Sequence, residues 1–179
     1  QFQSTEKDYQ VSITTNSLHI TSHLHKTYNN ATSDKKFRDV IKYVCDAFLK
    51  VVKIPSINRI GLRYIDECPI QEKTTDSFRA YYNTTFQLDR FRIEDVTEMA
   101  FRTVVKRDNH SIIYAEALRT IEGKLKLVLD FDGFALKVDT TKYLETTDEL
   151  HTIISNEYES VIKDPVYTYM REGENTDGQ

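Results

Sequence analysis

The segment INRIGLRYIDECP, residues 57–69, has the clearest local pattern in the chain and sets the expected fold. Apolar residues such as Ile60 and Leu62 take every second position, and Arg59 and Arg63 fall between them. Alternation with a period of two is typical of a β-strand that buries one face and exposes the other. We therefore expect a strand with its apolar side chains against helices and both arginines on the opposite face.

Two further patterns precede this strand. Residues 9–25, YQVSITTNSLHITSHLH, alternate on both sides of the polar pair Asn16-Ser17, which indicates a β-hairpin with one buried face. Residues 33–52, SDKKFRDVIKYVCDAFLKVV, change to the helical period and carry one apolar stripe. Ser33 is the expected N-cap of this helix, because a serine hydroxyl can accept a hydrogen bond from a free backbone N–H of the first turn.

The second half of the chain begins with three more expected strands. Residues 99–120 alternate on both sides of Asp108-Asn109, which predicts a strand, a turn and a strand. Residues 123–138, GKLKLVLDFDGFALKV, predict another strand. Its inward-facing set is expected to be Leu125, Leu127, Leu129 and Phe131.

The remaining segments predict helices and one long connection. Thr146 and Glu149 have the spacing of a capping box, so we expect the last long helix to begin there. A short helix is expected over residues 164–170. Residues 71–95 show no sustained period and are interpreted as a long excursion, with a short helix near residues 77–83.

Together these segments predict an α+β fold. Strands joined by short turns pair antiparallel, and helices with a single apolar stripe cover one face of a sheet. We expect one antiparallel sheet of about six strands with two main helices packed on one face. Residues 1–170 are expected to form a single domain, and residues 171–179 a flexible polar tail.

Composition limits the classes of protein to which the chain can belong. A chain of 179 residues suits one domain that needs no disulfide or metal for its core. A net charge of -4 argues against non-specific attraction to nucleic acid or to anionic membranes. Two cysteines are too few for a disulfide scaffold, and we expect a cytoplasmic protein. No apolar run approaches the roughly 20 residues that span a bilayer, so no membrane partner is expected.

The arginine-bearing strand carries the main candidate site, formed by Arg59, Gly61 and Arg63. A strand glycine often marks the close approach of a ligand or another backbone, and an arginine can donate two parallel hydrogen bonds to a carboxylate or phosphate. One hypothesis is therefore an anion-binding face. The other is cross-strand pairing of these arginines with Asp130 and Asp132, which alternation also places away from the apolar set.

Asp130 and Asp132 allow a catalytic alternative. They lie about 6.6 Å apart by strand geometry and could hold a divalent cation or act as acid and base. This alternative requires both carboxylates to be free of the arginines. Phosphate-binding, dinucleotide-binding and nucleophile-elbow motifs are all missing, so we expect no catalytic residue and no cofactor.

A histidine pattern offers a weaker metal hypothesis. In HITSHLH, His19, His23 and His25 would project to one side of a strand, and two of them could chelate a metal with a third ligand. Neither cysteine has a Cys-x-x-Cys partner that would complete such a site. Polar residues are expected at these positions in any case, so a solvated strand face is the favoured interpretation.

Further cations allow a nucleic-acid hypothesis. If they joined the two arginines on one face, the sheet would present a basic strip that suits a phosphate backbone. No aromatic residues interleave with them to stack bases, which weakens the idea. The cations in question are Arg102, Lys106, Lys124 and Lys126.

Five segments occur in the order FQSTEKDYQVSITTNSLHI, FRDVIKYVCDAFLKV, INRIGLRYIDECP, LVLDFDGF and LHTIISNEYESVIKD. In this order the chain resembles a sporadically distributed prokaryotic family of unknown function. Its hallmark is an RIGLRYIN-type strand, and Asp66 stands here where the family more often has asparagine. Family members usually carry an additional N-terminal strand and helix, which would precede Gln1. The resemblance transfers no established chemistry. The patchy distribution implies an accessory role in phage defence or in a toxin–antitoxin pair.

The leading functional hypothesis is a non-enzymatic binding or interaction module that uses an uncovered sheet face, or the 71–95 excursion, to bind a protein partner or to self-associate into a homo-oligomer. A small-anion-binding protein or metal-assisted hydrolase is the first alternative, with Arg59 and Arg63 holding an anionic group and Asp130 and Asp132 as metal ligand or base. Nucleic-acid binding through a local basic sheet face is the second alternative.

Overall fold

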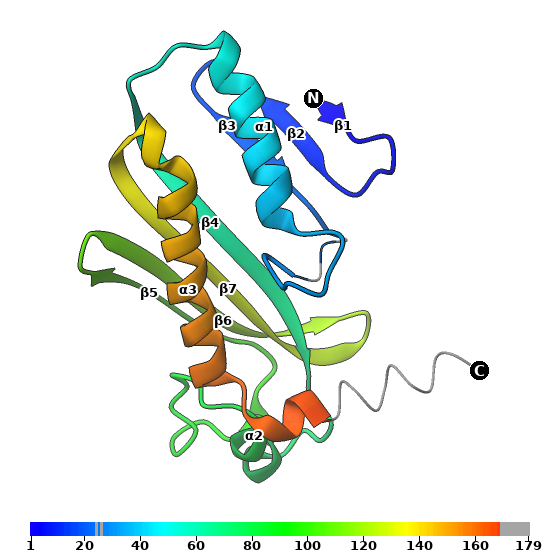
Figure 1. Cartoon of the computed structure of the whole chain (residues 1–179). Helices are drawn as coiled ribbons and strands as arrows, with labels where there is room; N and C mark the ends of the chain where they lie inside the picture. Colours follow the sequence, from blue (N-terminus) through cyan, green and yellow to red (C-terminus); the bar gives the residue numbers. More distant parts are fainter. Residues whose placement is uncertain (24, 26, 169–179) are drawn as a thin grey trace. The chain divides into compact units, whose positions relative to one another are not determined.

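In the computed structural model, the chain divides into two compact units (Figure 1). The small-sheet unit comprises Gln1–Ser56 and Asp139–Leu144, and the large-sheet unit comprises Ile57–Val138 and Glu145–Gln179. The structure describes residues 1–23, 25 and 27–168, so the predicted tail lies outside the described residues.

The small-sheet unit contains the predicted hairpin. Strands β2 (Gln10–Ile13) and β3 (Leu18–Thr21) pair antiparallel, with Val11 opposite Ile20. A short strand that the sequence did not indicate, β1 (Phe2–Gln3), pairs with β2 to complete the order β1-β2-β3. The hairpin is confirmed, although β3 ends at Thr21 and is shorter than its alternating pattern suggested.

Helix α1 (Phe37–Val51) belongs to the same unit and begins later than expected. The residue at its N-cap position is Lys36, whose side chain forms no capping bond. The Ser33 hydroxyl instead donates to the carbonyl of Lys35 within a turn. The first amides of α1 donate to Thr27 and Tyr28 carbonyls, at 3.2 and 3.0 Å. Because the preceding loop satisfies these donors, no side-chain cap is needed, and the Ser33 prediction was wrong.

The large sheet is formed by β4 (Ser56–Pro69), β5 (Met99–Arg107), β6 (His110–Ile121) and β7 (Lys124–Asp139). Its order is β4-β7-β6-β5, so β7 lies between β4 and β6. The predicted strand–turn–strand of residues 99–120 is confirmed by the antiparallel β5–β6 pair. The Glu122-Gly123 turn between β6 and β7 has positive φ at both residues, which matches the twist of a tight hairpin.

The α+β class is confirmed, but the strands form two sheets of three and four strands rather than one sheet of about six. Apolar alternation identifies a strand and its buried face, but it does not specify which strand lies beside it. The expectation that two helices cover one face of a single sheet was wrong for the same reason. Helix α3 (Tyr143–Val161) covers the large sheet, whereas α1 belongs with the small one (Figure 1).

The start of α3 also differs from its sequence signal. Thr146 is buried, and the helix begins at Tyr143 after a 3-10 turn, η2 (Thr140–Lys142). The side chain of Asp139 caps η2 by accepting from the backbone N–H of Thr141 at 2.8 Å, and Thr146 lies inside α3 rather than at its N-cap. A new helical segment then begins at Asp164, as predicted, and its expected end at residue 170 lies outside the described part of the chain.

The core of the large-sheet unit lies between β7 and α3. Leu129 and Phe131 are fully buried on the side of β7 that faces α3, as are Leu150 and Ile154 on the helix. A Cβ at Gly133 would lie 3.1 Å from the Cδ1 atom of Ile154. A glycine at this point of the strand therefore lets the helix approach the sheet closely.

The 71–95 excursion is packed rather than open. It forms α2 (Thr75–Tyr81), close to the predicted short helix, and the 3-10 turn η1 (Ile93–Asp95). Phe78 and Ile93 are 1% and 0% exposed, so this segment contributes core of its own to the large-sheet unit.

Replacing Phe131 with alanine is expected to lower the free energy of unfolding by about 3–5 kcal/mol, because the cavity left by a buried ring is only partly filled by relaxation. The Phe131 ring contacts the rings of Tyr158 and Tyr114, with centroids 4.7 and 5.3 Å away. Urea denaturation measures the change. The exposed Val104→Ala variant is the control and should change by less than about 0.5 kcal/mol. A similar small change in both variants would contradict this core assignment.

Candidate binding face

The candidate site is the outer face of the large sheet, defined as the face turned away from α3. Pleating sends Leu129 and Phe131 of β7 toward α3 and sends the residues between them outward. Register then identifies the outward residues of the neighbouring strands. Asp130 lies opposite Ala115 of β6, which lies opposite Arg102 of β5.

The structure brings the predicted arginines and aspartates together on this face as two ion pairs. Arg59 Nη2 donates to both carboxylate oxygens of Asp132, at 2.9 and 2.7 Å. Arg63 donates from Nε and Nη2 to the two oxygens of Asp130, at 2.7 and 2.5 Å. The cross-strand pairing hypothesis is confirmed, and both carboxylates are occupied by arginine in this arrangement.

Gly61 has a specific role in the first of these pairs. A Cβ at this position would lie 2.6 Å from the Nη1 atom of Arg59. The guanidinium therefore lies across the bare backbone of Gly61 on its way to Asp132, and it also stacks over the Phe134 ring, 4.7 Å from its centroid. The close approach predicted at this glycine is made by the arginine two residues before it, within the same strand.

A third pair extends the series along β4 and β7. Lys126 Nζ lies 2.6 Å from a carboxylate oxygen of Glu67. The β4 members of the three pairs are four residues apart, so Arg59, Arg63 and Glu67 form a ladder on one face. The hydrogen bond to Asp130 raises the pKa of Arg63. Because the arginine side chains are 46% and 55% exposed, each such pair contributes only about 0–1 kcal/mol to stability.

The cations of the nucleic-acid hypothesis lie on this same face. Arg102 and Lys106 are exposed on β5, opposite Ala115 and Ser111. Lys124 is exposed at the start of β7, opposite Ile121, and Arg119, which the sequence pattern did not indicate, lies opposite Lys126. Among the described residues, no carboxylate forms an ion pair with Arg102 or Lys106. The strand register, which single-sequence patterns do not supply, is the information that places Arg119 here.

Apolar side chains lie between these charges. Val104 is 53% exposed between Arg102 and Lys106, and Ile65 is 57% exposed between Arg63 and Glu67. The outer face therefore combines neutralised ion pairs on β4 and β7, cations on β5 that pair with no described carboxylate, and accessible apolar side chains on both edge strands.

The histidines of HITSHLH do not form a common site. Because β3 ends at Thr21, His23 and His25 lie beyond the strand, and the regular alternation that would align them with His19 is lost. His19 Nε2 lies 3.0 Å from Ser17 Oγ, and His25 Nδ1 lies 2.6 Å from Ser22 Oγ. Within residues 1–23, 25 and 27–168, no group of three His, Cys, Asp or Glu side chains could hold a metal ion.

The thiols and the remaining histidines occupy structural positions. Burial raises the pKa of Cys45 to about 11 and that of Cys68 to about 12, so both thiols are protonated at neutral pH and are poor nucleophiles. His110 Nε2 lies 3.1 Å from Glu149 of α3, a carboxylate partner that the sequence did not reveal. His151 Nδ1 lies 3.0 Å from the Tyr64 hydroxyl. Burial lowers the pKa of His151.

Two glutamates hold the 71–95 excursion in place. Glu116 is 3% exposed and accepts from the backbone N–H and hydroxyl of Thr85, at 2.9 and 2.8 Å. Glu94 accepts from the Thr75 hydroxyl at 2.7 Å and from Arg92 at 3.1 Å. The Glu94 pKa is lowered to about 2 by its own backbone N–H and by these two side chains.

The chain matches no family model, and no curated protein or solved structure is detectably similar to it. Within the described part of the chain, none of the helices is both long and apolar enough to span a membrane.

Replacing Gly61 with valine should displace the Arg59 guanidinium from Asp132 with little loss of overall stability, because the displaced atoms end a flexible side chain. A double-mutant cycle of Arg59→Ala and Asp132→Ala measures the coupling. We expect about 0.2–1 kcal/mol with Gly61 present and close to zero with valine. The Arg63–Asp130 cycle is the internal control and should keep its coupling in both backgrounds. Equal Arg59–Asp132 coupling in both would show that Gly61 does not set this contact.

Acid is expected to loosen the excursion through Glu94. A carboxylate with a lowered folded-state pKa adds stability above its ordinary value of 4.5, and this contribution is lost as the pH falls from 4.5 toward 2. The Glu94→Gln variant should therefore lose less stability than the unmodified protein between pH 6 and pH 2.5, as measured by denaturant titration. Glu98→Gln, at an exposed site nearby, is the matched control. Parallel pH profiles for Glu94→Gln and the unmodified protein would refute this role of Glu94.

Proposed function

We propose that the protein is a non-enzymatic binding module whose outer sheet face binds an acidic surface of a partner protein. The observation that carries this proposal is the exposed Arg102–Val104–Lys106 row on β5, in which two cations without an ion-pair partner among the described residues flank an accessible apolar side chain. A carboxylate-bearing surface would neutralise these cations and cover the valine.

The charge balance of the face supports an acidic partner. The chain as a whole has a net charge of -4, yet the cations on the outer face outnumber its carboxylates. Local positive potential on an otherwise acidic molecule directs an acidic partner to this face and disfavours its approach elsewhere. The cations are Arg59, Arg63, Arg102, Lys106, Arg119, Lys124 and Lys126, and the carboxylates are Glu67, Asp130 and Asp132.

The ion-pair ladder would give the contact its orientation. Arg59 is held by Gly61, Phe134 and Asp132, so little side-chain freedom remains to be lost when a partner covers it. The ion pairs on β4 and β7, and the cations on β5 that pair with no described carboxylate, make the two edges of the face chemically different. A partner can therefore bind in one direction only.

The first alternative, anion binding or metal-assisted hydrolysis, would require Asp130 and Asp132 to leave their arginines. Their bidentate contacts favour the binding role over the catalytic one. Calorimetry with Mg²⁺, Mn²⁺ and Zn²⁺ tests the metal version, and heat of binding from any of them that Asp130→Asn abolishes would support it.

The second alternative is nucleic-acid binding. It is favoured because the cations of the outer face lie together, and it is weakened because several of them are paired with carboxylates. Arg59, Arg63 and Lys126 are each neutralised by a carboxylate. Phe134, an aromatic residue on the face, is covered by the Arg59 guanidinium and offers no free ring for a base. The accessory role in prokaryotic defence and the cytoplasmic location implied by the sequence remain predictions alongside this proposal.

Reversing the β5 charges tests the proposal. The Arg102→Glu/Lys106→Glu variant should bind a partner captured from a native-host lysate, identified and then purified, at least about tenfold more weakly, because like charges then face each other. Affinity should also fall as salt increases. The control is Lys73→Glu/Arg90→Glu, which makes the same charge change at exposed positions of the excursion and should bind normally.

Two defined probes separate the alternatives in the same experiment. A fluorescent peptide of alternating glutamate and leucine and a single-stranded oligonucleotide of equal charge are titrated at low salt. The proposal expects measurable binding of the peptide, lost in the β5 variant. Binding of the oligonucleotide alone would favour the nucleic-acid alternative, and a partner that binds the β5 variant and the control equally would overturn the proposed face.

A further inference from the structure

The small-sheet unit buries few of its own side chains. Among its described residues, only Tyr28, Ile41 and Tyr143 are buried. A unit of this size usually needs a fuller core, a disulfide, a metal or a partner to be stable. Its exposed large apolar side chains are more numerous than its buried ones and comprise Phe2, Ile13, Tyr43, Val51, Val52 and Ile54.

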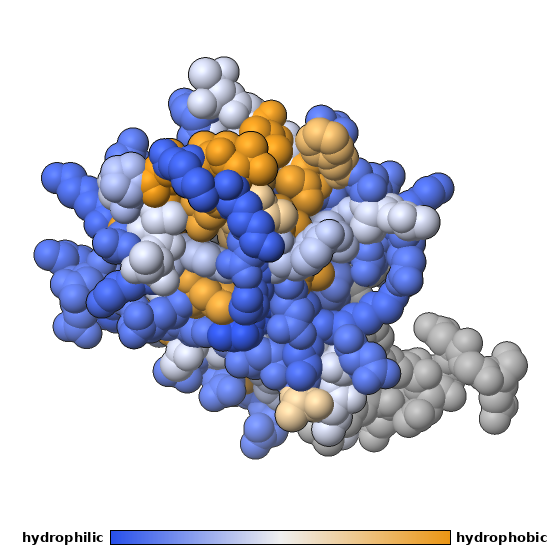
Figure 2. Space-filling model, turned by 45° about the horizontal axis from the view of Figure 1, so that its top comes forward, coloured by the Kyte–Doolittle hydropathy of each residue, from blue (hydrophilic) through white to orange (hydrophobic). Residues whose placement is uncertain are grey.

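In Figure 2 the molecule is turned so that the top of Figure 1, where α1 ends, comes forward. Hydrophobic side chains gather in the upper part of this view. Val51, the last residue of α1, is 83% exposed. Scattered exposed apolar residues are normal, but their accumulation in a unit with so little core indicates a surface that another molecule covers.

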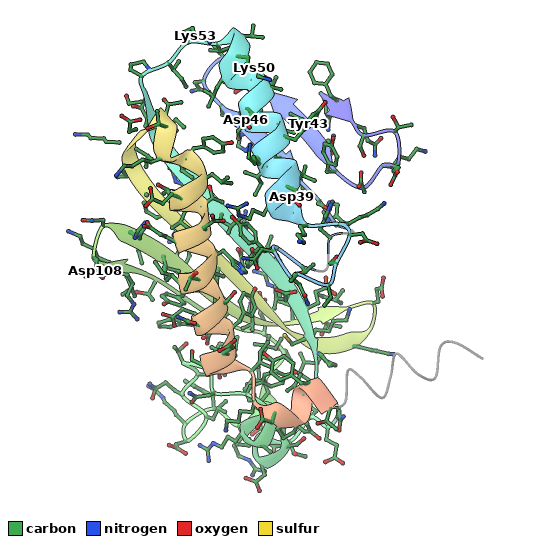
Figure 3. The ribbon with its side chains drawn as sticks, viewed as in Figure 1. Asp39, Tyr43, Asp46, Lys50, Lys53 and Asp108 are labelled. Atoms are coloured by element: carbon green, nitrogen blue, oxygen red, sulfur yellow. The ribbon has the colours of Figure 1, made fainter. Side chains whose placement is uncertain are left out.

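One side of α1 forms a continuous exposed stripe. Its residues have the spacing i, i+3, i+4, i+7, i+8 and i+11, which places them on one helical face. They line a shallow hollow of about 290 Å³. Several of them are labelled along the helix in Figure 3. The lining residues are Asp39, Lys42, Tyr43, Asp46, Ala47 and Lys50.

Shape alternates along this stripe. Tyr43 projects with 70% of its surface exposed, and Ala47, one turn later, has only a methyl group. A large side chain beside a small one is the pattern of a knob and a hole. In an antiparallel pair of α1 helices related by a two-fold axis, Tyr43 of each copy lies opposite Ala47 of the other.

Charge follows the same symmetry. Asp39 lies near the start of the helix and Lys50 near its end, about 16 Å away along the axis at 1.5 Å per residue. The antiparallel arrangement that opposes Tyr43 and Ala47 also brings Asp39 of each copy beside Lys50 of the other. A parallel arrangement would instead oppose like charges, so the stripe selects one orientation.

The other two charged residues of the stripe are already engaged within the unit. Asp46 accepts from Lys42 Nζ at 2.6 Å and from the Tyr143 hydroxyl at 2.7 Å. Asp39 and Lys50, by contrast, form no ion pair within the described part of the unit. The free charges are therefore the two that the antiparallel arrangement would pair.

We propose that the protein self-associates as a two-fold dimer through antiparallel packing of α1, with Tyr43 in the hollow at Ala47 and Asp39 paired with Lys50 of the second copy. The contact is made by residues of the small-sheet unit, and none of them belongs to the outer face of the large sheet. The stripe offers less surface area than a standard protein interface buries. We therefore expect a weak dimer with a Kd on the order of micromolar.

Sedimentation velocity and light scattering of the full chain test this dimer. The protein concentration runs from about 1 to 300 μM, a range chosen to include a Kd on the order of micromolar. We expect the mass to rise from one to two chains with concentration. Tyr43→Glu and Ala47→Arg, which remove the knob and fill the hole, should each leave a monomer throughout the range. Circular dichroism checks that both variants fold, and Lys7→Asp, at an exposed turn of the same unit, should dimerise normally.

Charge reversal gives the sharper test, because a two-fold contact can be restored. Asp39→Lys and Lys50→Asp should each weaken the dimer at least about tenfold, and the double variant should recover most of the lost affinity. A chain that stays monomeric at every concentration, or a double variant no better than the single ones, would overturn the proposal. Neither result bears on partner binding by the β5 variant, so the two proposals can fail separately.

Discussion

The alternation of side chains along β7 is the constraint on which the large-sheet unit depends. β7 is flanked by β4 and β6, so both of its backbone edges are used for pairing, and each residue can serve only one of the two faces. The inward positions hold Leu129 and Phe131 in the core beneath α3, while the outward positions hold Asp130 and Asp132 for the arginines of β4. A shift of register by one residue would exchange these sets and remove the core and the charged face together.

Patterns that depend on neighbouring residues could be predicted from the sequence. The strand–turn–strand around Asp108, the inward set of β7 and the outward direction of Arg59 and Arg63 all follow from alternation, which the backbone imposes on any strand. Even the pairing of these arginines with Asp130 and Asp132 could be anticipated, because opposite charges on one face of adjacent strands find each other once the strands are neighbours.

Features that depend on distant segments could not be predicted. The division of the strands into two sheets, the position of Arg119 and the contact of His110 with Glu149 all require the strand order or the tertiary fold. The helix starts were misplaced for a related reason. Ser33 and Thr146 have suitable side chains for capping, but the carbonyls of Thr27 and Tyr28 serve the first turn of α1, and a 3-10 turn capped by Asp139 precedes α3.

The excursion is fastened to the far end of α3 by its backbone, since Asn83 N–H donates to the carbonyl of Val161 and Lys163 N–H donates to that of Tyr81. These partners lie nearly half the chain apart, so the two hydrogen bonds have a high contact order. Closing the chain segment between the partners costs a large conformational entropy. Because synthesis runs from the N-terminus, the contacts of Tyr81 and Asn83 with residues at the end of α3 cannot form until residues 161–163 have been made. Until then the buried face of α2 lacks these contacts and is more open to chaperones.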